Sequence, residues 1–220
     1  MTIKIIMVVT ARPVNPFCWS RYDGVVSFPT WVPDEETKPA PMPLLVLQSF
    51  VNTWEGDSGV DLLRDPVAGP RWLRSAGLVD GTDVDLARAV AIRESVRALL
   101  VQNAGEGLAG PDDLASLRAL AAATDLRAAI GDDGRVDVRP AGDGLARLLV
   151  IVRDAQRDGS WWRLKACRNP DCRWAYYDRS HAGRGAWCDM AVCGNRMKNR
   201  SLRSRRSGGA APPPSDHHAH

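Results

Sequence analysis

The sequence of 220 residues has no uninterrupted apolar run that approaches the ~18 residues of a membrane-spanning helix. It also lacks a glycine-rich phosphate loop, a nucleophile elbow and a histidine–carboxylate metal motif. Of its histidines, only His181 lies outside the C-terminal tail. Because most histidine-based chemistry is therefore excluded, we expect a protein that is neither a membrane protein nor an enzyme.

The N-terminal residues make a poor secretory signal. The start, MTIKIIMVVTARP, has only a brief apolar stretch, and Arg12 and Pro13 follow it in place of a small-residue cleavage site. The apolar fraction of 45% and the charged fraction of 25% are those of a globular chain. We therefore expect a cytoplasmic protein.

Prolines set the first 43 residues apart from the rest of the chain. They fall at positions 13, 16, 29, 33, 39, 41 and 43, which rules out a long helix there. We predict a proline-rich N-terminal extension over 1–43, in which IKIIMVV and the segment around VVSF could form strands.

Residues 44–160 have the pattern of one α+β domain. Helical periodicity is clearest over 83–103, where Thr82 or Asp83 is the expected cap, and another helix is expected to begin at Pro70. The segment 126–140 alternates as strand, turn and strand. This pattern predicts a mostly helical N-terminal domain with a small antiparallel sheet.

Four of the five cysteines form two matched pairs with the spacing C-x4-C-x15-C-x4-C: Cys167, Cys172, Cys188 and Cys193. Disulfides and unrelated buried thiols are alternatives, but a reducing compartment disfavours the first and the repeated spacing disfavours the second. The pattern favours a Zn²⁺ site with four thiolates, which has no open position and is therefore structural. Arg168 and Arg173 would offset its negative charge.

Other metal-binding side chains are weaker candidates than these four. His181 is a rival ligand, but we interpret it as an exposed loop residue. The histidines at 217, 218 and 220 lie in a Gly/Pro-rich tail, 207–220, that we expect to be disordered. Cys18 stands alone in the extension and is interpreted as an incidental thiol. The gap between the cysteine pairs is long enough for a hairpin of its own.

The residues after Cys193 are strongly basic. From Gly194 to Arg206 there is no acidic residue, and the cations are Arg196, Lys198, Arg200, Arg203, Arg205 and Arg206. A helix beginning at Asn195 would place Arg196, Arg200 and Arg203 on one face. Six unopposed cations repel one another unless a polyanion is present, so this helix favours a nucleic-acid partner.

The segment 167–206 resembles the CGNR zinc finger, since Cys193-Gly194-Asn195-Arg196 is its namesake tetrapeptide. The motifs FVNTW (50–54), DLLRDP (61–66) and WLRSAGL (72–78) resemble the ABATE domain. Proteins with these two parts are regarded as bacterial transcriptional regulators, and some of them are linked to stress. The resemblance therefore implies a regulator with the finger as its DNA-binding part. We therefore expect a treble-clef-like zinc finger over 161–206.

The expected partner is double-stranded DNA. We expect Arg196, Lys198, Arg200 and Arg203 to contact phosphates, with one or two of them reading base edges. Arg205 and Arg206 would add non-specific attraction, and Asn195 would bond a base or cap the helix. The N-terminal domain would sense a small-molecule effector, with Asn52 and Thr53 at its pocket, or form a homodimer.

A second hypothesis is an RNA- or protein-binding module in which zinc only builds a surface. Trp174, Tyr176 and Tyr177 could then stack on unpaired bases. Packing around the zinc site is the competing interpretation of these aromatic residues. Competition between duplex DNA and single-stranded RNA would separate the two hypotheses.

Overall fold

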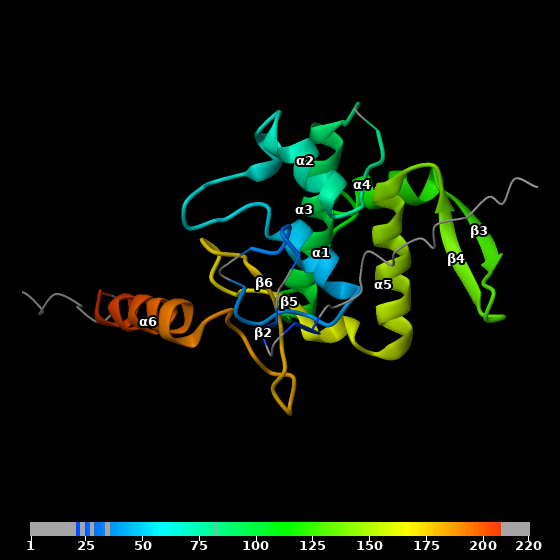
Figure 1. Cartoon of the computed structure of the whole chain (residues 1–220). Helices are drawn as coiled ribbons and strands as arrows, with labels where there is room; N and C mark the ends of the chain where they lie inside the picture. Colours follow the sequence, from blue (N-terminus) through cyan, green and yellow to red (C-terminus); the bar gives the residue numbers. More distant parts are fainter. Residues whose placement is uncertain (1–20, 23–24, 27–28, 34–35, 82, 208–220) are drawn as a thin grey trace, which may run out of the picture.

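The computed structural model describes residues 21–22, 25–26, 29–33, 36–81 and 83–207. Figure 1 shows helices gathered at the centre, with one helix and one hairpin projecting from opposite sides. The helices are α1 (Leu44–Val51), α2 (Ala68–Ser75), α3 (Leu86–Asn103), α4 (Ala115–Ala122), α5 (Arg147–Asp158) and α6 (Asn195–Ser207). Short 3₁₀ turns cover Leu62–Arg64, Gly144–Ala146 and Trp161–Arg163.

The strands pair as three antiparallel two-stranded sheets within the described residues. They are β1 (Arg21–Tyr22) with β2 (Val25–Val26), β3 (Asp125–Ile130) with β4 (Val136–Ala141), and β5 (Leu164–Ala166) with β6 (Ala175–Tyr177). The α+β fold class is thus confirmed. The strand predicted around VVSF corresponds to β2, whereas IKIIMVV lies outside the described residues.

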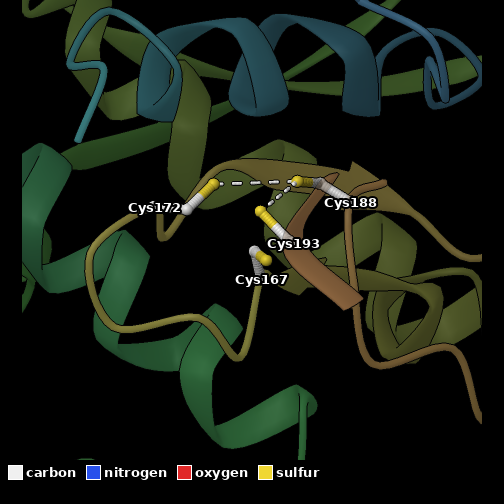
Figure 2. Close-up of side chains that lie close together, drawn as sticks. All are labelled: Cys167, Cys172, Cys188 and Cys193. Atoms are coloured by element: carbon white, nitrogen blue, oxygen red, sulfur yellow. Dashed lines mark hydrogen bonds between the residues drawn. The ribbon is translucent and has the colours of Figure 1, made fainter. Parts of the chain in front are cut away.

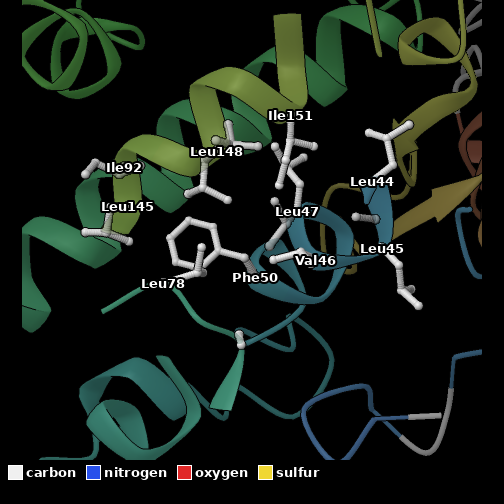
Figure 3. Packing of buried hydrophobic residues seen from close by; sticks show 14 of the residues in the cluster. Leu44, Leu45, Val46, Leu47, Phe50, Leu78, Ile92, Leu145, Leu148 and Ile151 are labelled. Atoms are coloured by element: carbon white, nitrogen blue, oxygen red, sulfur yellow. The ribbon is translucent and has the colours of Figure 1, made fainter. Parts of the chain in front are cut away.

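Helix α1 lies at the centre of the core, and every one of its residues is buried. Helix α1 contacts both α3 and α5, and Figure 3 shows Phe50 in the same cluster as Ile92 of α3 and Leu148 of α5. Such a short helix is stabilised mainly by tertiary packing, because an isolated eight-residue helix is marginal in water. The apolar run LLVLQSFV is therefore a core element that needs no polar face.

Two helix starts differ from the prediction. The cap of α3 is Asp85, whose carboxylate accepts a hydrogen bond from the Arg88 amide at 2.9 Å, and not Asp83. Helix α2 begins at Ala68, so Pro70 lies within its first turn instead of opening it. A proline is tolerated there because the first amides of a helix have no intrahelical acceptor.

The residues just before α1 belong to the same core as the helices. Trp31, Val32 and Ala40 are buried in it, and the Trp72 indole donates a hydrogen bond to the Trp31 carbonyl at 2.9 Å. The described residues from Trp31 onward therefore pack on the domain that we predicted to begin at Leu44.

The hairpin of the C-terminal module is also supported by the main core. Leu164, Ala166 and Ala175 are buried in the same apolar cluster as α1 and α3. Asn103, at the end of α3, donates hydrogen bonds to the Trp161 and Leu164 carbonyls at 3.1 and 3.0 Å. The prediction of a hairpin inside the gap between the cysteine pairs was wrong, because β6 pairs with β5 upstream of Cys167.

No helix in the described part of the chain is both long enough and apolar enough to cross a membrane.

Candidate metal centre and basic helix

The four paired cysteines converge on one point, although they come from two separate segments (Figure 2). Their sulfur atoms all lie within 4.8 Å of one another. The Cys172 and Cys188 sulfurs are 3.7 Å apart, and those of Cys188 and Cys193 are 3.8 Å apart. A tetrahedral ion with metal–sulfur bonds of ~2.3 Å separates its ligands by about 3.8 Å. The cluster therefore has the dimensions of a four-thiolate zinc site.

The first pair is positioned by the turn between β5 and β6. Cys167 directly follows β5, and its amide donates to the Trp174 carbonyl at 2.9 Å. The Asn169 carbonyl accepts from the amides of both Cys172 and Arg173 at 3.0 Å, which closes the x4 loop into a tight turn. Arg173 adopts the left-handed conformation (φ 51°) that turns the chain back into β6.

The second pair is positioned by the start of a helix. Residues Met190–Gly194 form a π-helical turn that leads directly into α6. Asp189 caps this turn by accepting a hydrogen bond from the Val192 amide at 2.9 Å. Cys188 thus directly precedes the cap and Cys193 lies in the turn, so the position of α6 is tied to the cluster.

Gly194 provides room for this arrangement. A Cβ at this position would lie 2.5 Å from the Met190 sulfur and 3.2 Å from Cδ1 of the Trp187 ring. The absence of a side chain therefore lets Trp187 pack beside the cluster, against Cys167, Cys172 and Cys193.

The electrostatics of the cluster favour a bound cation. Hydrogen bonding to the Cys167 sulfur, together with burial, raises the pKa of Cys188, and the same two causes raise the pKa of Cys172 to about 12. Four thiols so close together resist forming four thiolates unless a cation compensates the charge. The donor set therefore fits Zn²⁺, which binds thiolates.

One group that we did not predict contacts a sulfur of the cluster. Asn169 donates toward the Cys193 sulfur at 3.8 Å. Arg168, which we predicted to offset the charge of the cluster, donates to the Ala104 carbonyl at the end of α3. Arg173, the second predicted group, pairs with Glu106 and donates to the Cys167 carbonyl at 3.4 Å. These two arginines therefore anchor the turn to the N-terminal domain.

Helix α6 carries the basic residues away from the cluster and toward solvent (Figure 1). The exposed residues include Asn195, Arg196, Lys198, Arg200, Arg203 and Arg205. Asn195 does not act as the cap, because its Nδ2 donates to the Ala191 carbonyl at 2.9 Å and Asp189 holds the cap position. Arg206 lies in the helix, but its side chain is outside the described part.

The three arginines of the predicted face line one surface cavity of about 350 Å³, together with Asn169 and Asp171. Arg196 contacts both carboxylate oxygens of Asp57 at 2.8 and 2.9 Å, and Arg200 lies 3.4 Å from Asp171. These two acidic partners were not predicted. Asp57 is far from α6 in the sequence, and no local pattern relates the two.

Residues 46–157 match the family described as "Putative stress-induced transcription regulator", ABATE. The chain belongs to the ABATE family. Residues 163–206 match the CGNR zinc finger. Both matches confirm the resemblance read from the sequence, and the finger match together with the close cysteine cluster shows a zinc site. No curated protein matches the chain.

The other side chains considered for the finger have different environments. His181 is exposed, and the tail histidines and Cys18 lie outside the described residues. Tyr176 is buried, and its hydroxyl donates to the Gly185 carbonyl at 2.7 Å, so its ring packs inside the CGNR finger. Trp174 and Tyr177 are half-buried.

Asn52 and Thr53 of the ABATE domain line a cavity, but their polar groups are already bonded within the protein. Asn52 accepts from the Ala175 amide at 2.7 Å and donates to the Ala175 carbonyl at 2.9 Å and to Glu36 at 3.0 Å. Thr53 donates to the Phe50 carbonyl and accepts from Arg93. Asn52 thus joins α1 to β6 of the finger.

Proposed function

We propose that this protein is a DNA-binding transcriptional regulator of the bacterial cytoplasm. Cys167, Cys172, Cys188 and Cys193 would bind one Zn²⁺, and α6 would contact duplex DNA. The observation that carries the proposal is that the basic helix starts at the cysteine cluster itself and keeps its cations exposed. A metal-anchored basic helix holds cations in a fixed geometry against a phosphate backbone.

The role of the zinc in this proposal is structural. Four cysteine thiolates fill a tetrahedral shell, so no position is open for a substrate or an activated water. The metal site would hold the turn at 167–172 against the helical turn at 190–194. Because α6 follows that helical turn directly, its orientation would be fixed as well. Nothing in this role requires catalysis.

The proposed contacts follow from exposure and charge. Arg196, Lys198, Arg200 and Arg203 would bind phosphates, and Arg205 and Arg206 would add attraction that does not depend on sequence. Asn195 is exposed, and its Oδ1 could accept a hydrogen bond from a base edge. The family match to a transcription regulator supports this assignment at the level of the whole chain.

The test is a titration of zinc-loaded protein against duplex DNA at several salt concentrations. Arg200→Ala should weaken binding and reduce the slope of log K against log salt by about 0.9, because one phosphate contact is lost. Arg127→Ala, an exposed arginine on β3 far from the finger, is the matched control and should change neither quantity. Unchanged affinity and slope in Arg200→Ala would contradict contact between α6 and DNA.

A competing single-stranded RNA in the same assay tests the alternative function. If RNA displaces the duplex at equal concentration, the finger is a general nucleic-acid module and not a duplex reader. Selection of genomic fragments then tests sequence specificity.

For the ABATE domain we propose a sensing role, with the cavity at Asn52 and Thr53 as the effector site. Homodimerisation through this domain stays a prediction, and light scattering of the purified protein checks it.

A further inference from the structure

The effector cavity lies where the ABATE domain meets the zinc finger. It is open to solvent and has a volume of about 360 Å³, which is within the range of small-molecule sites. Trp31, from the segment before α1, and Trp72, from α2, line it on one side, and Trp174, between Cys172 and Ala175, lines it on the side of the finger. Three tryptophans therefore line one space, and a ligand in it would touch both parts of the protein.

Some of the polar groups at this cavity have hydrogen-bond partners within the protein, and one does not. The side chains of Asn52 and Thr53 form hydrogen bonds with other groups of the protein, and the Trp72 indole donates to the Trp31 carbonyl. Ser49 also lines the cavity, is fully buried, and its hydroxyl has no hydrogen-bond partner among the described residues. A buried hydroxyl without a partner is unfavourable, so a ligand that bonds Ser49 would be favoured.

The charges at the cavity have one sign. Glu55 is the charged residue in its lining, and no lysine, arginine or histidine of the described chain joins it there. Behind the wall, Asn52 donates to Glu36 at 3.0 Å and Arg93 donates to Thr53 at 3.2 Å, so the negative charge that faces the cavity is that of Glu55. An anionic ligand would therefore be repelled, whereas a cation would be attracted by Glu55 and by the faces of the indole rings.

We propose that this cavity binds a small aromatic amine in its cationic form, with its ring against the tryptophans and its ammonium group toward Glu55 and the Ser49 hydroxyl. The inference deepens the proposed function, because it rests on the sensing role and names the chemical class of the effector. One carboxylate oxygen of Glu55 accepts a hydrogen bond from the Ser58 hydroxyl, so the groups left for the N–H donors of an ammonium group are its second oxygen and the Ser49 hydroxyl.

The test is calorimetric titration of the zinc-loaded full-length protein with two indoles of opposite charge. Tryptamine carries an ammonium group and indole-3-propionate a carboxylate, and both present the same ring. Tryptamine should bind saturably at one site, about tenfold more tightly than indole-3-propionate. Absence of saturable tryptamine binding, or equal affinity for the two probes, overturns the proposal.

Two substitutions assign the binding to this cavity. Glu55→Gln removes an exposed carboxylate and should abolish most of the preference for the cation. Ser49→Ala should weaken tryptamine binding about threefold, because one hydrogen bond is lost. Asp132→Asn removes an exposed carboxylate from the β3–β4 turn and should leave binding unchanged. If Glu55→Gln leaves the preference intact, the ligand binds elsewhere and the proposal fails.

The outcome separates this inference from the function on which it rests. Zinc content and duplex binding are measured on the same samples. If the protein binds DNA but has equal affinity for tryptamine and indole-3-propionate, only the proposed class of effector is overturned. A protein that binds tryptamine but no duplex overturns the proposed DNA-binding function alone.

Discussion

At the scale of single residues, the cysteines show how far local spacing can predict a site. Each pair is held by a loop of four residues, so each half of the cluster follows from the sequence. The partners of the arginines could not be predicted in this way. Asp57 and Asp171 reach Arg196 and Arg200 through tertiary packing, and no spacing in the chain signals that packing.

Cys188→Ser should remove the metal from the finger. Three thiolates and a hydroxyl hold Zn²⁺ much more weakly, because an unactivated serine stays protonated and binds zinc poorly. We expect loss of stoichiometric zinc, measured by mass spectrometry of the metal after dialysis. Cys18→Ser, which changes the one cysteine outside the two pairs, is the matched control and should retain one zinc per chain. Full zinc content in Cys188→Ser would contradict a four-thiolate site.

Glu36 should make folding depend on pH. Burial raises the pKa of its carboxyl group above the ordinary value for glutamate, although hydrogen bonds from Lys38 and Asn52 oppose this. A raised pKa means that the neutral acid is favoured in the folded protein. Its contribution is therefore fully present below the unfolded pKa of ~4.3 and is lost as pH rises through the folded value.

Glu36→Gln should remove this dependence. The free energy of unfolding in urea, compared for both proteins between about pH 5 and pH 8, should fall with pH more steeply in the wild type. The comparison is made on slopes, because an amide cannot accept both of the hydrogen bonds that the carboxylate accepts. Parallel slopes for the two proteins would show that Glu36 has an ordinary pKa.

At the scale of elements, sequence periodicity predicted which segments form helices but not where they start. The predicted helix over 83–103 contains α3, yet the cap moved to Asp85 because its side chain, and not that of Asp83, reaches a free amide. The β3–β4 hairpin was predicted because its turn is local. The pairing of β6 with β5 was not predicted, because β5 lies upstream of the first cysteine pair, outside the gap in which we expected the hairpin.

The loop that follows α1 packs closely against the cysteine turn. A Cβ on Gly56 would overlap the Asp171 carbonyl and lie 2.7 Å from the Cys172 carbonyl oxygen, both backbone atoms that cannot move aside cheaply. Gly56→Ala should therefore destabilise the folded protein by about 1–3 kcal/mol. The measurement is urea unfolding of the zinc-loaded protein.

Gly81→Ala is the control for this loop. The nearest atom to a Cβ there is 3.9 Å away, so the substitution should be tolerated. Similar losses of stability in Gly56→Ala and Gly81→Ala would mean that the loop does not press on the turn in solution.

At the scale of the whole molecule, the two family segments share one apolar core. Predicted boundaries at 44 and 161 follow changes in composition, which do not report on packing. Trp31 enters the core from before the first boundary, and Leu164 and Ala166 enter it from after the second. The finger is therefore supported both by its metal site and by α3, so its hairpin need not depend on zinc alone.

This shared architecture places an acidic residue of the ABATE domain on the basic helix. Asp57, in the loop that packs on the cysteine turn, forms an ion pair with Arg196 at 2.8 Å. Both side chains are substantially exposed, so the pair itself stabilises folding little. It would nevertheless compete with a phosphate for the same guanidinium group, since Asp57 already holds it.

Asp57→Asn should therefore strengthen duplex binding by about two- to fivefold at low salt. In this variant Arg196 has no ion pair with a carboxylate, so no ion pair has to break when Arg196 binds a phosphate. Fluorescence anisotropy with labelled DNA measures the change, and the exposed Asp112→Asn serves as a control that removes the same charge elsewhere. In an Arg196→Ala background, Asp57→Asn should gain nothing beyond that control. A gain that persists without Arg196 would mean that Asp57 acts through its general charge, and an unchanged affinity in Asp57→Asn would mean that Arg196 does not meet the DNA.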